Sequence, residues 1–140
     1  MKTTALPKAL VIEDEEAIRS FVTYALESEG YAVTACGSCA EGLQKFHEGG
    51  YSVVVTDIML PDRDGIEAII EMRRLHPQPA IVAMSGVGSR DRLLGLARMF
   101  EADAAIEKPF TVPQLIKAVS EAVRCREERL RRLWGERWGA

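Results

Sequence analysis

The chain has 140 residues, of which 47% are hydrophobic and 28% charged, which predicts one domain with a single core. No apolar run approaches the ~20 residues that a membrane-spanning helix needs, and no signal peptide is evident, so we expect a cytoplasmic protein without membrane contact. The net charge is −3, but residues 124–140 contain six Arg and three Glu, which leaves residues 1–123 with 12 basic and 18 acidic residues. An acidic body argues against nucleic acid as a partner.

The chain begins with a short apolar run, residues 8–12, that predicts a buried strand. A helix is expected over residues 17–26, where apolar residues recur at helical spacing. Gly30 is placed to end it, because glycine readily adopts the left-handed conformation common after a helix. A second strand is expected over residues 31–35.

The middle of the chain repeats this alternation of strand and helix. Ser38 can cap a helix that runs to about His47, because its hydroxyl oxygen can accept a hydrogen bond from a free N–H of the first turn. Residues 53–56 form the third predicted strand. The third helix begins at Gly65 and ends before "HPQP".

The last predicted strands are residues 80–84 and 104–107, with a helix over about residues 90–100 between them. The final helix begins near Thr111. Pro113 lies in its first turn, where a missing N–H costs little.

The alternation of strands and helices predicts an α/β fold with a doubly wound parallel sheet, because strands without polar alternation are buried on both faces. We expect five strands in the flavodoxin-like order 2-1-3-4-5, followed by an extended C-terminal helix. In this architecture ligands bind beyond the carboxyl ends of the strands, where strand order reverses. The functional residues should therefore lie at those ends.

Polar residues do follow four of the strands. Glu13 and Asp14 follow the first, Asp57 ends the third, Ser85 follows the fourth and Lys108 the fifth. Because the first and third strands are neighbours in the expected order, their carboxylates should be close, and a hard cation such as Mg²⁺ would relieve their repulsion. A carboxylate can act as nucleophile toward a phosphoryl group, with Mg²⁺, an ammonium and a hydroxyl binding its oxygens.

These residues lie in "LVIEDEE", "VVVTDIMLPDRDG", "AMSG" and "EKPF", and with them the chain resembles a bacterial response-regulator receiver domain (CheY-like) over about residues 7–123. The resemblance implies that Asp57 accepts a phosphoryl group from a histidine kinase or histidine phosphotransfer protein. It implies that Ser85 contacts a phosphoryl oxygen and that Lys108 pairs with the phosphate. It also implies a cis Lys108–Pro109 bond. Such a domain catalyses its own phosphotransfer and slow autodephosphorylation, without a conventional small-molecule substrate.

The resemblance also implies how Mg²⁺ is bound. Asp14, Asp57 and the Met59 backbone carbonyl would be ligands, and Glu13, in place of the commoner Asp, would bind through water. Ala105 occupies the position where the family often has a switch aromatic. A methyl side chain has no rotamer to switch, so we expect signalling through the fourth helix, the fifth strand and the last helix toward an unknown downstream protein.

The same pattern has alternative interpretations. A flavodoxin-like FMN protein would need a Ser/Thr/Gly phosphate loop after the first strand, and a haloacid-dehalogenase-like phosphatase would need D-x-D, whereas Ile58 and Met59 follow Asp57. A receiver-shaped interaction module that is never phosphorylated remains open, as does a receiver fragment of a longer transcriptional regulator or hybrid kinase. Cys36 and Cys39 form a C-x-x-C pair, for which we favour a structural role over a redox role.

The basic C-terminal region, residues 124–140, is expected to continue the last helix as an extension of a receiver domain spanning residues 1–123. We expect no output domain in it, and the resemblance is to a single-domain response regulator. Three interpretations stay open: a solvated helical extension, a homodimer or partner contact through Trp134 and Trp138, and a linker to an output domain.

Overall fold

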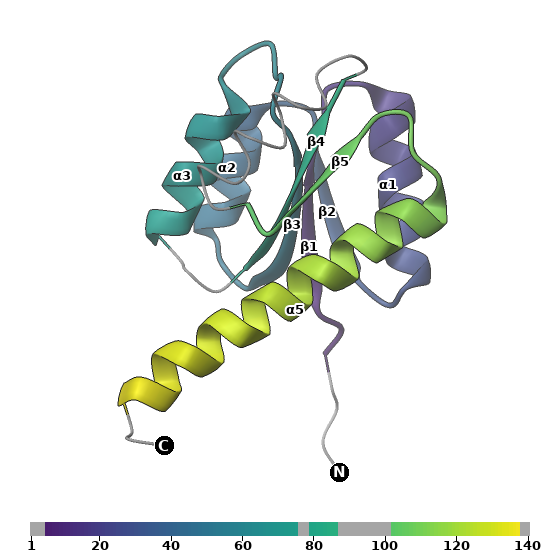
Figure 1. Ribbon diagram of the computed structural model, residues 1–140. Coiled ribbons are helices and arrows are strands. Elements are labelled where there is room, and N and C mark those ends of the chain that lie inside the picture. Colours follow the sequence, from purple (N-terminus) through teal and green to yellow (C-terminus); the bar gives the residue numbers. More distant parts are fainter. Residues whose placement is uncertain (1–4, 76–78, 87–101, 138–140) are drawn as a thin grey trace.

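The fold is a single five-stranded parallel sheet covered by helices on both faces (Figure 1), as the computed structural model describes it for residues 5–75, 79–86 and 102–137. The strand order is β2-β1-β3-β4-β5, which confirms the predicted order. The strands are β1 (Lys8–Ile12), β2 (Ala32–Cys36), β3 (Tyr51–Asp57), β4 (Ala80–Ser85) and β5 (Ala104–Glu107). Because β1 pairs with both β2 and β3, the carboxyl ends of β1 and β3 are adjacent.

The helices are α1 (Glu16–Ser28), α2 (Cys39–His47), α3 (Gly65–Leu75) and α5 (Val112–Arg137). Figure 1 shows α2 and α3 on one face of the sheet and α1 and α5 on the other. The helix predicted over about residues 90–100 lies outside the described residues. Among the residues that the structure describes, no helix is long and apolar enough to cross a membrane.

The sheet separates two apolar clusters, because successive side chains of a strand point to opposite faces. Leu10 and Ile12 of β1 pack with α2 and α3, whereas Ala9 and Val11 pack with α1 and α5. All four side chains are fully buried. The central strands are therefore buried on both faces, as expected for a parallel sheet.

The predicted signals at helix ends are borne out. Ser38 Oγ accepts a hydrogen bond from Glu41 N–H at 3.2 Å, and Gly30 follows α1 with a φ of 95°. At the start of α5, Thr111 and Gln114 bond each other's backbone N–H through their side chains, a reciprocal cap that the sequence analysis missed. The second strand begins at Ala32 and ends at Cys36, one residue later than predicted.

The C-terminal part of α5 contacts the body of the domain. Arg129 Nη1 lies 2.5 Å from Asp103 Oδ1, and Arg73 Nη2 of α3 lies 2.9 Å from Asp103 Oδ2. The Asp103 side chain is 4% exposed and also accepts a hydrogen bond from Ile81 N–H at 2.8 Å. Beyond this contact, Trp134 is 53% exposed. The predicted boundary at residue 123 thus falls inside one continuous helix, and the domain division stays a prediction.

Candidate functional site

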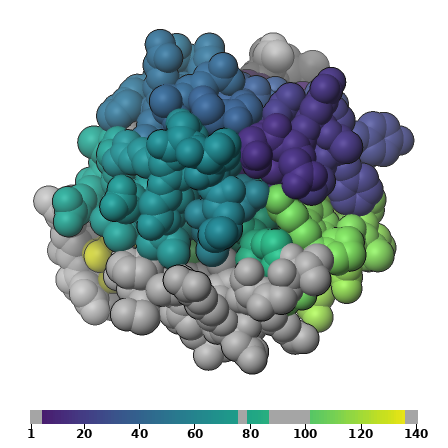
Figure 2. Space-filling view, turned by 90° about the horizontal axis from the view of Figure 1, so that it is seen from above, coloured from purple at the N-terminus to yellow at the C-terminus, as the bar shows by residue number. Residues whose placement is uncertain are grey.

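Chain segments far apart in sequence meet at the carboxyl edge of the sheet. Figure 2 views the molecule from above, where the purple, teal and green parts of the chain adjoin. Asp57 is the last residue of β3 and Ser85 the last of β4. Lys108 follows β5 directly, and its N–H donates to the Ser85 carbonyl at 2.8 Å. The parallel register therefore brings the predicted site residues to one edge.

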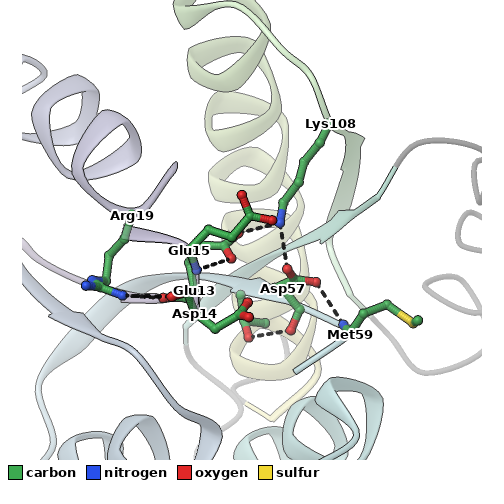
Figure 3. A network of polar contacts seen from close by, with 8 residues as sticks. Glu13, Asp14, Glu15, Arg19, Asp57, Met59 and Lys108 are labelled. Carbon is green, nitrogen blue, oxygen red and sulfur yellow. Dashed lines mark hydrogen bonds and ion pairs between the residues drawn. The ribbon is translucent and has the colours of Figure 1, made fainter. Parts of the chain in front are cut away.

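Asp57 is almost fully buried, at 4% exposed, and both of its carboxylate oxygens have a partner. Oδ1 accepts a hydrogen bond from Met59 N–H at 2.8 Å, and Oδ2 lies 2.6 Å from Lys108 Nζ (Figure 3). The Met59 side chain itself is 70% exposed. The backbone after β3 thus turns back toward the carboxylate and fixes its orientation.

Lys108 bridges two buried carboxylates. Its Nζ lies 2.5 Å from Glu13 Oε1 as well as 2.6 Å from Asp57 Oδ2. Burial opposes the charge on Lys108, but the hydrogen bonds to Asp57 and Glu13 outweigh it and raise the Lys108 pKa. Burial raises the pKa of Glu13, against the opposing effects of Lys108 and of the Glu15 N–H, which donates to Glu13 Oε2 at 3.0 Å.

The acidic residues at this edge fit a divalent cation. One carboxylate oxygen from each of Glu13, Asp14 and Asp57 lies within 4.8 Å of the other two. Among the described residues, no other group of three or more His, Cys, Asp or Glu side chains brings its ligand atoms this close together. Carboxylate oxygens without Cys or His are the donors that Mg²⁺ prefers. Because one lysine ammonium faces this set of carboxylates, an additional positive charge would be favourable. The donor chemistry therefore fits the predicted Mg²⁺.

Ser85 contributes a buried hydroxyl to the same edge. The residue is fully buried, and its Oγ has no hydrogen-bond partner in the part of the chain that the structure describes. A buried polar atom without a partner is costly, which makes Ser85 Oγ available to a ligand oxygen. Ala105 lies in β5 opposite Ala83 and packs against the core on the α2 and α3 side.

The turn from β3 into α3 requires Gly65. A Cβ at this position would lie 2.4 Å from both the Asp57 carbonyl oxygen and Ile58 Cα, closer than real Cβ contacts allow. The Gly65 N–H donates to the Ile58 carbonyl at 3.1 Å. The glycine thus lets the start of α3 pack directly against the backbone of Asp57.

The peptide bond between Lys108 and Pro109 is cis, as the resemblance implied.

Arg19 is a site residue that the sequence analysis missed. Its Nη1 donates to the Glu13 carbonyl at 2.9 Å and lies 3.4 Å from the Asp14 carbonyl. Figure 3 shows the Arg19 side chain reaching from α1 to the backbone that carries both acids. Arg19 orients the acidic loop by bonding its backbone carbonyls and not its carboxylate oxygens. Arg19 lies just over one helical turn into α1 and close to Glu13 in sequence, and this position was the signal that the sequence offered for its contact with the acidic loop.

The cysteine pair belongs to the core. Cys36 is 1% exposed and Cys39 is fully buried, and both are free thiols in the cluster between the sheet and α2. Burial raises the pKa of Cys36 to about 12 and also raises the pKa of Cys39. A protonated, buried thiol is a poor nucleophile, which supports the structural interpretation.

We expect the double substitution Cys36→Ser/Cys39→Ser to lower stability but to leave phosphoryl uptake at saturating Mg²⁺ within about twofold of the wild type, because both thiols belong to the core cluster and neither belongs to the acidic group. Urea unfolding and intact-mass spectrometry after incubation with acetyl phosphate measure the two quantities. Loss of uptake on mild oxidation of the wild type, with the double variant resistant, would contradict this expectation.

The chain is similar in sequence and fold to response regulator receiver domains. Residues 9–120 match the family model described as "Response regulator receiver domain". Among solved structures, a response regulator receiver domain protein from Clostridium thermocellum is 32% identical, with a TM-score of 0.79, over 89% of this chain and 99% of that one. A CheY-like receiver domain protein from Methanospirillum hungatei is 28% identical, with a TM-score of 0.80 and the same shares of both chains.

Curated relatives are longer proteins. An uncharacterized transcriptional regulatory protein of Bacillus subtilis, YkoG, is 35% identical over 116 residues, which is 82% of this chain and 50% of that protein. The sensor kinase CckA of Brucella abortus is 35% identical over 117 residues, which is 80% of this chain and 12% of the kinase. The chain thus spans half the length of the transcriptional regulator and a small part of the kinase.

Proposed function

Because the chain belongs to the response regulator receiver domain family of two-component signalling, we propose that it accepts a phosphoryl group on Asp57 from a phosphohistidine. The observation that carries the proposal is the pairing of the buried Asp57 carboxylate with Lys108, at the same sheet edge as the Ser85 hydroxyl, which has no hydrogen-bond partner among the described residues. A carboxylate, an ammonium and a hydroxyl at one sheet edge supply a nucleophile and two donors to phosphoryl oxygens. An enclosed carboxylate with no such donors would favour a purely structural role.

In the proposed reaction, an Asp57 carboxylate oxygen attacks the phosphorus of a phosphohistidine. The P–N bond to the imidazole breaks as the P–O bond to Asp57 forms, and the imidazole leaves with the electron pair. The Lys108 ammonium, now between Asp57 and Glu13, moves its hydrogen bond to a phosphoryl oxygen, and Ser85 Oγ donates to another. Mg²⁺ bound by Asp14, Asp57 and the Met59 carbonyl, with Glu13 acting through water, would neutralise phosphoryl charge.

Incubation of the full chain with acetyl phosphate and Mg²⁺ tests the proposal. We expect the intact mass to increase by one phosphoryl group, and peptide mapping after borohydride reduction to locate it at Asp57. Uptake should disappear when EDTA removes the divalent cation. A chain that stays unmodified at saturating acetyl phosphate and Mg²⁺, or that is modified only at another residue, would support the interaction-module alternative.

Asp14→Ala should weaken Mg²⁺ binding by at least about tenfold, because it removes a direct carboxylate ligand. Glu16→Ala is the matched control: Glu16 begins α1, two residues farther along the same acidic run, and removes the same charge. Isothermal titration calorimetry with MgCl₂ gives both affinities. Similar losses in the two variants would mean that general negative charge, and not ligation by Asp14, attracts the cation.

The partners follow from the same proposal. A histidine kinase or histidine phosphotransfer protein would supply the phosphoryl group, and a downstream protein would bind the surface formed by the predicted fourth helix, β5 and α5. A homodimer through α5 is an alternative use of that surface. The coverage of YkoG and CckA also favours a second context, in which this sequence acts within a longer regulator or hybrid kinase. A phosphotransfer profile against the histidine kinases of the source organism would identify the donor.

A further inference from the structure

The loop between β3 and α3 carries the Met59 backbone, which is bonded to the end of β3 and to the far end of the loop. The Met59 N–H bonds Asp57 Oδ1 at 2.8 Å, and Met59 pairs with Asp64 in an isolated antiparallel bridge. Ile58 and Leu60 are buried, at 7% and 8% exposed. The tip of this loop, residues 61–63, lies beyond these contacts, so its position depends on what the tip itself binds.

Asp62, at the tip, binds a different element of the fold. Its Oδ1 accepts a hydrogen bond from Cys39 N–H at 3.1 Å, and its Oδ2 accepts one from Ala40 N–H at 3.0 Å. One carboxylate thus satisfies two free N–H groups of the first turn of α2, more than 20 residues away in sequence. Those two bonds lower the Asp62 pKa, so the carboxylate is ionised at neutral pH.

The helix that Asp62 binds is fixed on the sheet. A Cβ at Gly42 of α2 would lie 2.4 Å from Ile12 Cδ1, so the helix backbone approaches β1 closely. Cys39 is fully buried. On the other side of the loop tip, Arg63 Nη2 lies 2.9 Å from Glu71 Oε1 of α3. Asp62 and Arg63 therefore hold the tip between two helices packed on the same face of the sheet.

The capping role of Asp62 can be separated from a role in holding the loop. Ser38 Oγ caps the next N–H of the same turn, that of Glu41, at 3.2 Å. Both side chains stabilise the start of α2, but Ser38 directly precedes that helix, whereas Asp62 comes from the loop after the phosphoacceptor. Removal of Ser38 Oγ weakens the cap alone. Removal of the Asp62 carboxylate weakens the cap and also removes one of the two side-chain contacts that hold the loop tip.

We propose that Asp62 is a positioning residue for the cation site: by joining the β3–α3 loop to α2, it holds the Met59 carbonyl where it can bind Mg²⁺ beside Asp57. This inference rests on the proposed function, since it assigns Asp62 a part in forming the same site. Asp62 touches neither the cation nor the phosphoryl group and acts through the loop backbone. Without Asp62, the Met59 backbone would be held only by its own N–H bond to Asp57 and by its bridge to Asp64, a weaker constraint on its carbonyl that would weaken Mg²⁺ binding.

The test compares Asp62→Ala, Asp62→Asn and Ser38→Ala with the wild-type chain. Calorimetric titration with MgCl₂ should show about tenfold weaker binding by Asp62→Ala and an intermediate loss for Asp62→Asn, which keeps one acceptor oxygen. Ser38→Ala should bind Mg²⁺ as the wild type does, while its urea unfolding midpoint falls as the loss of a cap requires. Hydrogen exchange without metal should be faster at Met59 and Gly65 in Asp62→Ala only.

Three outcomes would overturn the inference. The first is an Asp62→Ala variant with wild-type Mg²⁺ affinity. The second is a Ser38→Ala variant that loses as much affinity as Asp62→Ala, which would assign the effect to the stability of α2. The third is wild-type exchange at Met59 in metal-free Asp62→Ala. A wild-type chain that takes no phosphoryl group while binding Mg²⁺ normally would contradict the proposed function but leave the role of Asp62 in cation binding intact. If Asp62→Ala does not fold, Asp62→Asn carries the same comparison.

Discussion

Asp57→Asn is expected to lose phosphoryl uptake from acetyl phosphate by at least about a thousandfold, below detection in an intact-mass experiment that fully modifies the wild type. The substitution replaces the nucleophilic carboxylate by an amide of the same shape, and the remaining oxygen can still accept the Met59 N–H bond. The fold should therefore persist, which circular dichroism would verify. The reason for the loss is chemical, because an amide oxygen is a poor nucleophile toward phosphorus.

Asp64→Asn is the matched control for this substitution. Asp64 lies in the loop after Asp57 and caps α3 through a 2.9 Å bond from Ile66 N–H to its Oδ1, which asparagine can also accept. This variant should take up the phosphoryl group as the wild type does. Equal uptake by wild type and Asp57→Asn would show that acetyl phosphate modifies another group, and the assignment of Asp57 would be wrong.

Asp103→Ala is expected to destabilise the protein by about 3–5 kcal/mol, because it removes the carboxylate from a buried ionic cluster. Asp103 is 4% exposed at its side chain and pairs with Arg73 and Arg129, so its loss removes a counter-charge from both guanidinium groups. It also removes the acceptor for the Ile81 N–H. Equilibrium unfolding in urea measures the change.

The exposed acid Glu128 of α5 provides the control for Asp103. Glu128→Ala removes the same charge from the same region and should change the unfolding free energy by less than about 0.5 kcal/mol. Arg129→Ala should fall between the two, since Arg129 is 25% exposed and water can replace part of its contact. A loss below about 1 kcal/mol in Asp103→Ala would mean that the cluster contributes little to stability.

The sheet order and the meeting of the acidic residues, Ser85 and Lys108 at one edge were predictable, because buried strands have recognisable apolar runs and parallel strands end at the same edge. The start of α2 after Ser38 was predictable for a similar reason, since a helix cap is a local interaction. By contrast, the one-residue shift of β2 reflects its place at the sheet edge, where all of its residues except Cys36 are at least partly exposed and the apolar signal is weak.

The contacts that the sequence did not reveal join side chains to distant backbone or to distant charges. Asp62 binds the N–H groups of Cys39 and Ala40, and nothing in "LPDRDG" indicates that an exposed acid in a turn faces another helix. Asp103 and Arg129 are 26 residues apart, and an arginine on a basic helix is usually solvated. Such pairs become visible only once the fold sets the helices beside each other.

The position of Trp134 gives the C-terminal helix its own optical signal. The chain has two tryptophans, Trp134 and Trp138, and both come after Arg129 in sequence, while residues 1–133 contain none. Intrinsic fluorescence excited at the tryptophan band therefore reports on the surroundings of the extension and is insensitive to the interior of the sheet. In one melting experiment, fluorescence would follow release of the extension from Asp103, while far-ultraviolet circular dichroism would follow loss of the whole fold. Separate midpoints would show that the helix end detaches first.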